Sequence, residues 1–165
     1  MSRRSKTRAG SVLAASFVAM MVLAPGTAAA SRLDALPFAE TPASGVGHES
    51  WRLLQATNES RERYDLPPLR LNVELSAIAR QHSMVMARAG SLFHTPDVGI
   101  YLRAIVWRTW GENVGYTPGD VGSVQAAFMA SPIHREHILD GAFRHVAIGA
   151  VRVDGTLWVT VFFYG

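Results

Sequence analysis

The chain has 165 residues, 48% of them hydrophobic, and contains no cysteine. Its formal net charge is +3, but four of the 16 basic residues lie in the first eight positions, which leaves 12 basic residues against 13 acidic ones. This balance excludes the strongly basic surface that nucleic-acid binding requires. We expect one domain, whose hydrophobic core folds without disulfides.

Residues 1–30 have the three parts of a secretory signal peptide: a basic start, an apolar run and a small-residue end at Ala28-Ala29-Ala30. The apolar run is shorter than the roughly 20 residues that span a bilayer. We therefore predict cleavage after Ala30, no transmembrane anchor thereafter, and a secreted protein that is extracellular or associated with the cell wall. Residues 31–47 predict a flexible linker, because they are rich in Ala, Pro, Ser and Gly, and residues 48–165 predict the folded domain.

The first predicted helix covers residues 48–65 and ends before Pro67. Its inward face carries apolar residues and then two polar ones, Asn58 and Arg61. Polar groups on an inward face must be hydrogen-bonded. We therefore expect Asn58 and Arg61 to tie this helix to a neighbouring loop rather than to contact a substrate.

The second predicted helix begins after Asn72, a favourable N-cap, and ends before Gly90, which suits the position after a helix. His82 lies in its apolar stripe, and we expect a core histidine with a hydrogen-bond partner. His94 follows on a loop, directly before Thr95-Pro96, and residues 97–104 predict a short helix. A loop histidine near a helix end is a candidate for chemistry.

Residues 105–116 alternate in hydrophobicity and predict a strand. The expected inward face consists of Val106, Trp110, Glu112, Val114 and Tyr116. Desolvation would raise the pKa of a carboxylate on such a face, whereas a nearby cation or metal would lower it. Glu112 therefore needs a partner, and it is the charged residue that we single out, as part of a metal site, an acid–base pair or a buried hydrogen-bond network.

Asp120 predicts the start of a further helix. Ser131, followed by proline, predicts the N-cap of a shorter one, with His134 in its first turn and His137 on nearly the same face. Residues 146–153 and 156–163 then form β-rich runs joined by Asp-Gly, which predicts a hairpin with a type I′ turn. The last strand is apolar on both faces, so we expect a sheet between two layers of helix.

Five motifs occur in the order seen in the CAP superfamily of SCP-like extracellular domains, which includes cysteine-rich secretory proteins, antigen 5 and plant pathogenesis-related proteins. They are Asn58-x-x-Arg61, Ala79-Arg80-Gln81-His82, Leu92-Phe93-His94, Gly111-Glu112-Asn113-Val114 and Ser131-Pro132-Ile133-His134-Arg135. The chain resembles the bacterial branch of this family from about residue 49 onward. The resemblance implies an α+β fold, a three-layer α-β-α sandwich with a small, mainly antiparallel sheet.

In that family two histidines and two acidic residues line a central cavity, which binds a divalent metal in some members. The resemblance assigns His94, Glu112 and His134 to three of these positions. The fourth is missing, because residues 121–130 contain no Asp or Glu, so a partial site for zinc or magnesium is implied. His137 stands where the bacterial branch usually has Asn; it could add a ligand or simply form a hydrogen bond within its helix.

Three functions are compatible with these residues. The favoured one is a binding module, whose cavity, lined by His94, Glu112, Asn113 and His134, holds an apolar small molecule such as a lipid or sterol, a cell-wall component or a protein partner. The second is a metal-dependent, peptidase-like hydrolase that uses His94, Glu112 and His134. The third is a buried polar network with function at a surface patch. The sequence favours binding over catalysis, because no nucleophile elbow or metalloprotease helix appears.

Overall fold

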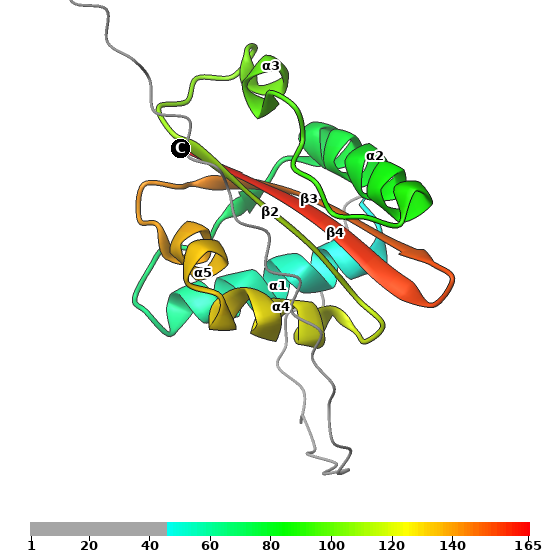
Figure 1. Ribbon diagram of the computed structural model, residues 1–165. Coiled ribbons are helices and arrows are strands. Elements are labelled where there is room, and N and C mark those ends of the chain that lie inside the picture. Colours follow the sequence, from blue (N-terminus) through cyan, green and yellow to red (C-terminus); the bar gives the residue numbers. More distant parts are fainter. Residues whose placement is uncertain (1–45) are drawn as a thin grey trace, which may run out of the picture. The chain divides into compact units, whose positions relative to one another are not determined.

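A computed structural model describes residues 46–165 (Figure 1). Within these described residues, nine elements follow one another. They are α1 (His48–Glu62), β1 (Arg70–Leu71), α2 (Val73–Ala89), α3 (Val98–Leu102), β2 (Trp110–Thr117), α4 (Val121–Ala130), α5 (Pro132–Leu139), β3 (His145–Val153) and β4 (Thr156–Tyr164). The predicted signal peptide and residues 31–45 of the predicted linker lie outside the described residues.

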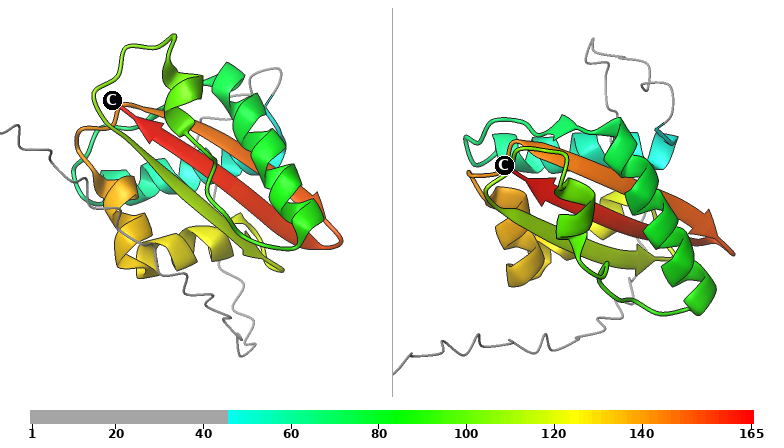
Figure 2. Two further views of the ribbon diagram at one scale, coloured as in Figure 1. Left: turned by 45° about the horizontal axis from the view of Figure 1, so that its top comes forward. Right: turned by 90° about the horizontal axis from the view of Figure 1, so that it is seen from above.

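The four strands form one sheet in the order β1-β3-β4-β2. The short β1 pairs with β3 in parallel, and the other two pairings are antiparallel. The helices α2 and α3 cover one face, and α1, α4 and α5 cover the other (Figures 1 and 2). The predicted α-β-α sandwich with a mainly antiparallel sheet is therefore confirmed, and β2 forms one edge of the sheet.

The polar residues predicted to be structural have that role. The amide of Asn58 donates to the carbonyl oxygen of Leu69 and accepts from the Leu69 N–H. The guanidinium of Arg61 is fully buried and donates to four carbonyl oxygens. They belong to Pro67, Ile138, Asp140 and Phe143. Arg61 thereby fixes the end of α5 against α1.

The caps of α2 match the sequence prediction. The side chain of Asn72 accepts from the N–H of Leu75, and Gly90 ends the helix in the left-handed conformation with φ 61°. His82 is buried, and its Nε2 atom lies 2.8 Å from the carbonyl oxygen of Phe93. The predicted core histidine is therefore confirmed, and it holds the segment that follows α2 against the helix.

The sheet has an apolar core on each face. One lies toward α1, α4 and α5 and includes Leu53, Phe128 and Ile138; the other lies toward α2 and α3 and includes Ala79 and Phe162. The helix α2 packs closely on β3, because a Cβ at Gly149 would overlap the backbone of Ala79 and Arg80. The predicted hairpin turn is also confirmed, with positive φ angles of 47° at Asp154 and 79° at Gly155.

Some local predictions are wrong. The strand β2 begins at Trp110 rather than at residue 105, and three residues expected on its inward face are exposed, namely Val106 (98%), Tyr116 (50%) and Trp110 (40%). The reason is pairing: β4 ends at Tyr164, and Gly165 exchanges backbone hydrogen bonds with Thr109, so residues 105–108 have no neighbouring strand. The first helix also ends at Glu62, three residues earlier than predicted.

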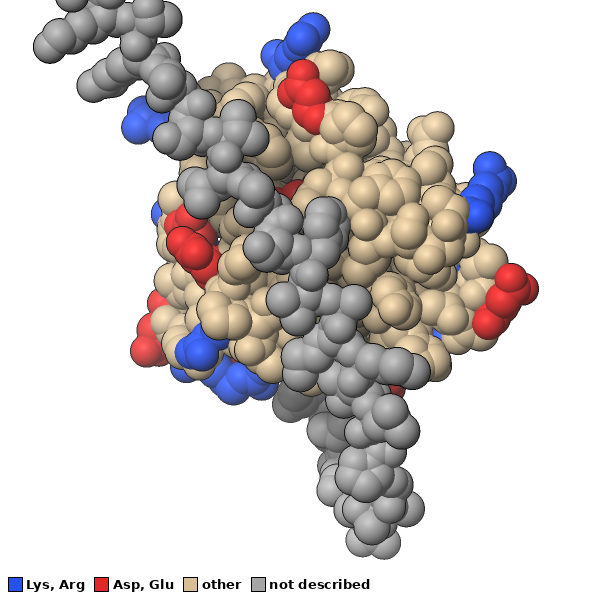
Figure 3. Space-filling view, viewed as in Figure 1, with Lys and Arg blue, Asp and Glu red and all other residues tan. Residues whose placement is uncertain are grey.

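No helix within residues 46–165 combines the length and the hydrophobicity needed to cross a membrane. On the face shown in Figure 3, charged side chains of both signs are scattered rather than gathered by sign.

Candidate functional site

The side chains of consecutive residues in the edge strand β2 point to opposite faces of the sheet, because side chains alternate along a strand. Glu112 points toward the segment that follows α2, where it contacts His94 and Thr95. Asn113 points toward α5, where it contacts the backbone of His134 and the ring of His137. The candidate site therefore lies at the edge of the sheet, with one half on each face of β2.

The carboxylate of Glu112 is buried, with only 3% of the side chain exposed, and both oxygens are hydrogen-bonded. The Thr95 hydroxyl donates to Oε1 at 2.6 Å, and the Thr95 N–H lies 3.1 Å from each oxygen. Nδ1 of His94 lies 2.7 Å from Oε2 and donates to it. A buried carboxylate is tolerated when it is this well hydrogen-bonded.

The imidazole of His94 is 48% exposed, in contrast to its carboxylate partner. The hydrogen bond that His94 donates to Glu112 raises the pKa of His94, although partial burial of the ring opposes this effect. Because Nδ1 is bound to Glu112, the Nε2 atom is the one left for contact with a ligand. The Glu112 carboxylate thus orients His94, in the way that carboxylates orient metal-bound or catalytic histidines.

Asn113 is fully buried, and its side chain contacts two residues of α5. Its amide nitrogen donates to the carbonyl oxygen of His134 at 3.0 Å, and its Oδ1 atom lies 2.8 Å from Nδ1 of His137. Since Oδ1 can only accept, Nδ1 of His137 carries the proton in this pair. The structure therefore gives Asn113 a positioning role, and the prediction that it contacts a ligand stays untested.

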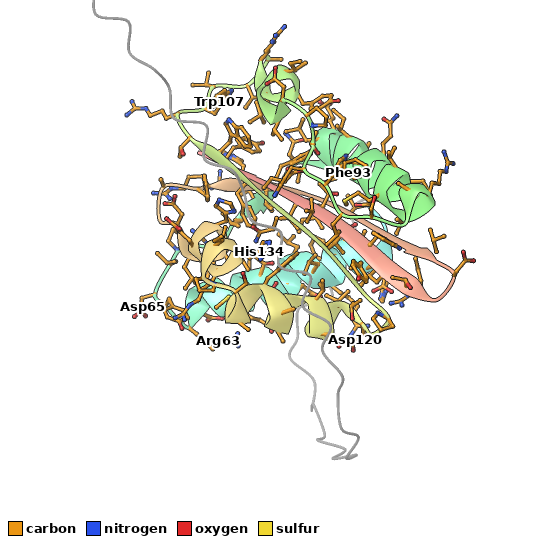
Figure 4. All side chains as sticks on the ribbon, in the orientation of Figure 1. Arg63, Asp65, Phe93, Trp107, Asp120 and His134 are labelled. Atoms are coloured by element: carbon orange, nitrogen blue, oxygen red, sulfur yellow. The ribbon has the colours of Figure 1, made fainter. Side chains whose placement is uncertain are left out.

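His134 lies in the first turn of α5 (Figure 4). Its Nδ1 atom lies 2.9 Å from the hydroxyl oxygen of Ser131, and its ring packs against Phe128 with the centroids 5.1 Å apart. The Ser131 side chain thus contacts His134 and forms no hydrogen bond with the helix backbone, unlike a typical N-cap. These two contacts fix the ring, and neither of them uses the Nε2 atom as a hydrogen-bonding group.

Burial lowers the pKa of His134 and of His137. The pKa of His134 is lowered further by positive charge on His137 and on His94, and the pKa of His137 by positive charge on His94. The structure places His94 against Glu112, and it places His134 and His137 against Asn113. That His94 and His134 share one cavity stays a prediction. The ring of His137 also lies directly over Gly111 of β2.

The sequence predicted a partial site for zinc or magnesium, which requires side-chain atoms that are free to bind a metal. Among residues 46–165, no group of three or more His, Asp or Glu side chains is arranged to hold a metal ion. Both oxygens of Glu112 already accept hydrogen bonds, whereas the hydrogen bonds of His94, His134 and His137 all use Nδ1 and leave Nε2 as the ring atom not engaged in them. Imidazole nitrogen atoms are suitable zinc ligands, and typical catalytic zinc sites use three protein ligands.

Two hollows occur away from these residues. One, of about 460 Å³, lies along α1 and is lined by Trp51, Leu54, Gln55, Asn58, Glu59, Glu62, Leu66 and Pro68. The other, of about 320 Å³, lies at the junction of α4 and α5 and includes Met129, Arg135 and Leu139. Neither contains His94, Glu112 or His134. These hollows are therefore separate from the candidate site.

Sequence reasoning missed two contributors, Thr95 and Ser131. Thr95 follows His94 directly, and its adjacency to a candidate histidine was the available signal. Ser131 precedes His134 by three residues, which places the two side chains together in the first turn of α5. Both were visible as hydroxyl residues close to candidate histidines.

Comparison with known proteins shows the family to which the chain belongs. The family model described as the cysteine-rich secretory protein family, CAP, matches residues 54–163. The protein YkwD of Bacillus subtilis is 30% identical over 127 residues, which are 73% of this chain and 49% of that protein. The chain therefore spans about half the length of this relative.

Solved structures show the same fold. An extracellular SCP-domain protein from Bacillus anthracis has a TM-score of 0.61 at 22% identity, covering 70% of this chain and 40% of its own. A cysteine-rich secretory protein from Staphylococcus aureus has a TM-score of 0.59 at 28% identity, and the match covers 74% of this chain and 40% of that protein. An outer surface protein of Borrelia burgdorferi has a TM-score of 0.62 at 16% identity, and the match covers 70% of this chain and 91% of that protein. Although it contains no cysteine, the chain belongs to the CAP family of cysteine-rich secretory proteins.

Proposed function

We propose that this chain is an extracellular CAP-domain protein that binds a polar cell-wall component through His94 and His134. The observation that carries the proposal is the contrast within one hydrogen-bonded pair. Glu112 is 3% exposed and His94 is 48% exposed, so a buried carboxylate holds an imidazole whose outer nitrogen can contact a ligand. This geometry lowers the entropic cost of binding, because the ring is oriented before the ligand arrives.

The polar character of the site favours a ligand with hydroxyl, amide or carboxylate groups. The raised pKa of His94 favours a cationic ring that donates from Nε2, whereas the lowered pKa of His134 favours a neutral ring. A donor beside a neutral imidazole suits the oxygen-rich groups of glycans and short peptides. A purely apolar lipid or sterol would leave these nitrogen atoms without partners.

An extracellular location is supported by the relatives. The Bacillus anthracis protein is described as extracellular and the Borrelia burgdorferi protein as an outer surface protein. The predicted signal peptide at residues 1–30 leads to the same location. A cell-wall component is therefore a ligand that this protein would meet.

Cosedimentation with purified peptidoglycan sacculi tests the proposal. We expect His94→Ala to reduce the bound fraction about tenfold or more, since a hydrogen bond to a charged group contributes about 1.5–3 kcal/mol. His48→Ala is the matched control, because His48 is exposed at the start of α1 and away from Glu112. Equal binding by His94→Ala, His48→Ala and wild type would contradict the proposed site. Binding to neutral sterol-containing vesicles or to a protein partner that is lost in His94→Ala, without binding to sacculi, would contradict the proposed ligand.

A second candidate is a metal-dependent hydrolase, favoured by one observation: Glu112 orients His94 as carboxylates orient zinc-bound histidines. The Nε2 atoms of His94 and His134 would hold the metal. Bound zinc would supply an activated water. Calorimetric titration of the chelator-treated protein with Zn²⁺ tests this candidate. Heat that disappears in both His94→Ala and His134→Ala would support it, whereas no heat with wild type would contradict it.

A further inference from the structure

The segment of residues 98–110, here called the α3 arm, exposes an unusual share of apolar side chains. Of the nine large hydrophobic residues that are exposed within residues 46–165, four lie in this arm. They are Ile100 (47% exposed), Tyr101 (40%), Val106 (98%) and Trp110 (40%). Single exposed apolar residues are normal on a protein surface, but a local group of them indicates an interaction surface.

The exposure belongs to a folded segment. Val98 and Leu102 of α3 are fully buried and pack on Phe162 and Tyr164 of the sheet. The indole N–H of Trp107 donates to the carbonyl oxygen of Leu102 at 3.1 Å, which closes the arm onto its own helix (Figure 4). The arm therefore has buried apolar residues that anchor it to the sheet and exposed apolar residues that meet solvent.

The charges of the arm are all positive. Arg103 and Arg108 are exposed, and the arm contains no Asp or Glu. Neither arginine forms an ion pair with a carboxylate in the described part of the chain. Asp97, which is exposed just before α3, is the one carboxylate adjoining the arm in sequence. The arm thus combines exposed aliphatic and aromatic side chains with two guanidinium groups that face solvent.

We propose that the α3 arm is a docking surface for an anionic lipid bilayer. Aromatic and aliphatic side chains enter the boundary between headgroups and acyl chains, while arginines contact lipid phosphates at the surface. Trp110 and Tyr101 suit the interface, because their rings are apolar with a polar end. Arg103 and Arg108 add electrostatic attraction to an anionic surface.

The nearly complete exposure of Val106 favours a bilayer over a phosphate-bearing polymer or a protein as the partner of the arm. A phosphate-bearing polymer in water would pair with Arg103 and Arg108 but would provide no apolar medium for Val106. A stable protein interface buries about 800 Å² on each partner and requires a surface matched in shape to the arm. A bilayer needs no matching surface, because lipids rearrange around a protruding side chain. This inference does not depend on the function proposed for His94 and His134.

Cosedimentation of the exported chain with two kinds of vesicle tests the proposal. One kind is phosphatidylcholine alone, and the other is an equimolar mixture of phosphatidylcholine and phosphatidylglycerol. We expect binding to the anionic vesicles that weakens at high ionic strength. Val106→Asp should weaken this binding about tenfold or more, because it removes the apolar contact and adds a repelled carboxylate. The double variant Arg103→Ala, Arg108→Ala should weaken it by about thirtyfold.

Val85→Asp is the matched control, since Val85 is 44% exposed on α2 and lies outside the arm. It should bind anionic vesicles like wild type, and circular dichroism should show that all variants are folded. The proposal is overturned if wild type binds neither vesicle, if it binds both equally, or if Val106→Asp and Val85→Asp bind alike. Retention by a protein or a teichoic-acid-like polymer in place of anionic vesicles would also overturn it.

Discussion

Nδ1 of His94 lies 2.7 Å from Oε2 of Glu112, and only the histidine of this pair reaches solvent. The carboxylate is fixed by Thr95 and gives its remaining interaction to the imidazole. The buried Glu112 carboxylate thus sets the pKa of His94, whereas the His94 ring itself is exposed to solvent. The protonation of the exposed ring can therefore be measured directly by titration.

Removing the charge of Glu112 should change the protonation of His94. The hydrogen bond with Glu112 is the main cause of the raised pKa of His94, and burial acts in the opposite direction. We therefore expect Glu112→Gln to lower the pKa of His94 to its ordinary value or below, measured by NMR titration of the ring protons. Thr95→Val is the control, since it leaves the contact between His94 and Glu112 in place. An unchanged pKa of His94 in Glu112→Gln would contradict the assigned cause.

The stability of the domain should fall on the acid side of neutrality. Burial lowers the pKa values of His134 and His137 below the ordinary value of 6.5, so the unfolded chain binds these protons more readily. Their contribution is complete above about pH 6.5 and is lost as the pH falls below it. The raised pKa of His94 has the opposite effect: its contribution is complete below that pH and is lost as the pH rises through the folded value.

Thermal unfolding followed over this pH range tests the balance of these effects. We expect His137→Gln to reduce the acid-side decrease in Tm, because one of the two groups that must remain neutral is removed. His48→Ala, which changes an exposed histidine, should leave the decrease as it is in wild type. A decrease of the same size in His137→Gln and wild type would show that His137 does not contribute.

Truncating Arg61 should destabilise the fold strongly. Its guanidinium is fully buried and supplies the donors for four carbonyl oxygens. We expect Arg61→Ala to lower the free energy of unfolding by about 3–5 kcal/mol, because the carbonyls lose their partners and a cavity forms. The exposed Arg52→Ala should change it by less than about 0.5 kcal/mol. Urea unfolding measures both, and similar losses in the two variants would contradict the assigned role.

A methyl group at Gly149 should separate α2 from the sheet. Its Cβ would overlap the backbone of Ala79 and Arg80, which cannot move as a flexible side chain can. We expect Gly149→Ala to cost about 1–3 kcal/mol or more of unfolding free energy, measured in urea. At Gly141 the added Cβ would be at an ordinary 3.6 Å from a leucine side chain, so Gly141→Ala should cost much less. Equal costs at the two positions would refute the close packing.

The fold was predictable where local signals and tertiary packing agree. Asn72 and Gly90 bound α2, and Asp154-Gly155 forms the hairpin turn, because each residue satisfies a backbone requirement of its own segment. Val106 was misplaced for the opposite reason. Its alternating neighbours are typical of a strand, but a strand needs a partner, and the position where β4 ends is not encoded near Val106.

The sequence identified candidate residues of the site but not their contacts. The resemblance identified His94, Glu112 and His134; the structure places His94 against Glu112, and that His134 shares their cavity stays a prediction. It could not show that Thr95 and His94 occupy both oxygens of Glu112, because this depends on how the loop after α2 meets β2. Nor could it show that His137 bonds to Asn113, since that contact joins positions 24 residues apart.

Because Glu112 and Asn113 alternate along β2, the arrangement of the site depends on the register of this strand. The two halves of the site are assigned to opposite faces solely by the pairing of β2 with β4, in which Glu112 is opposite Phe162. A slip of one residue would turn the acid toward α5 and the amide toward His94. The same slip would place side chains where Gly111 and Gly115 now leave room for His137 and Phe128. Gly111 and Gly115 therefore favour the observed pairing of β2 with β4, because a slipped strand would bring larger side chains against His137 and Phe128.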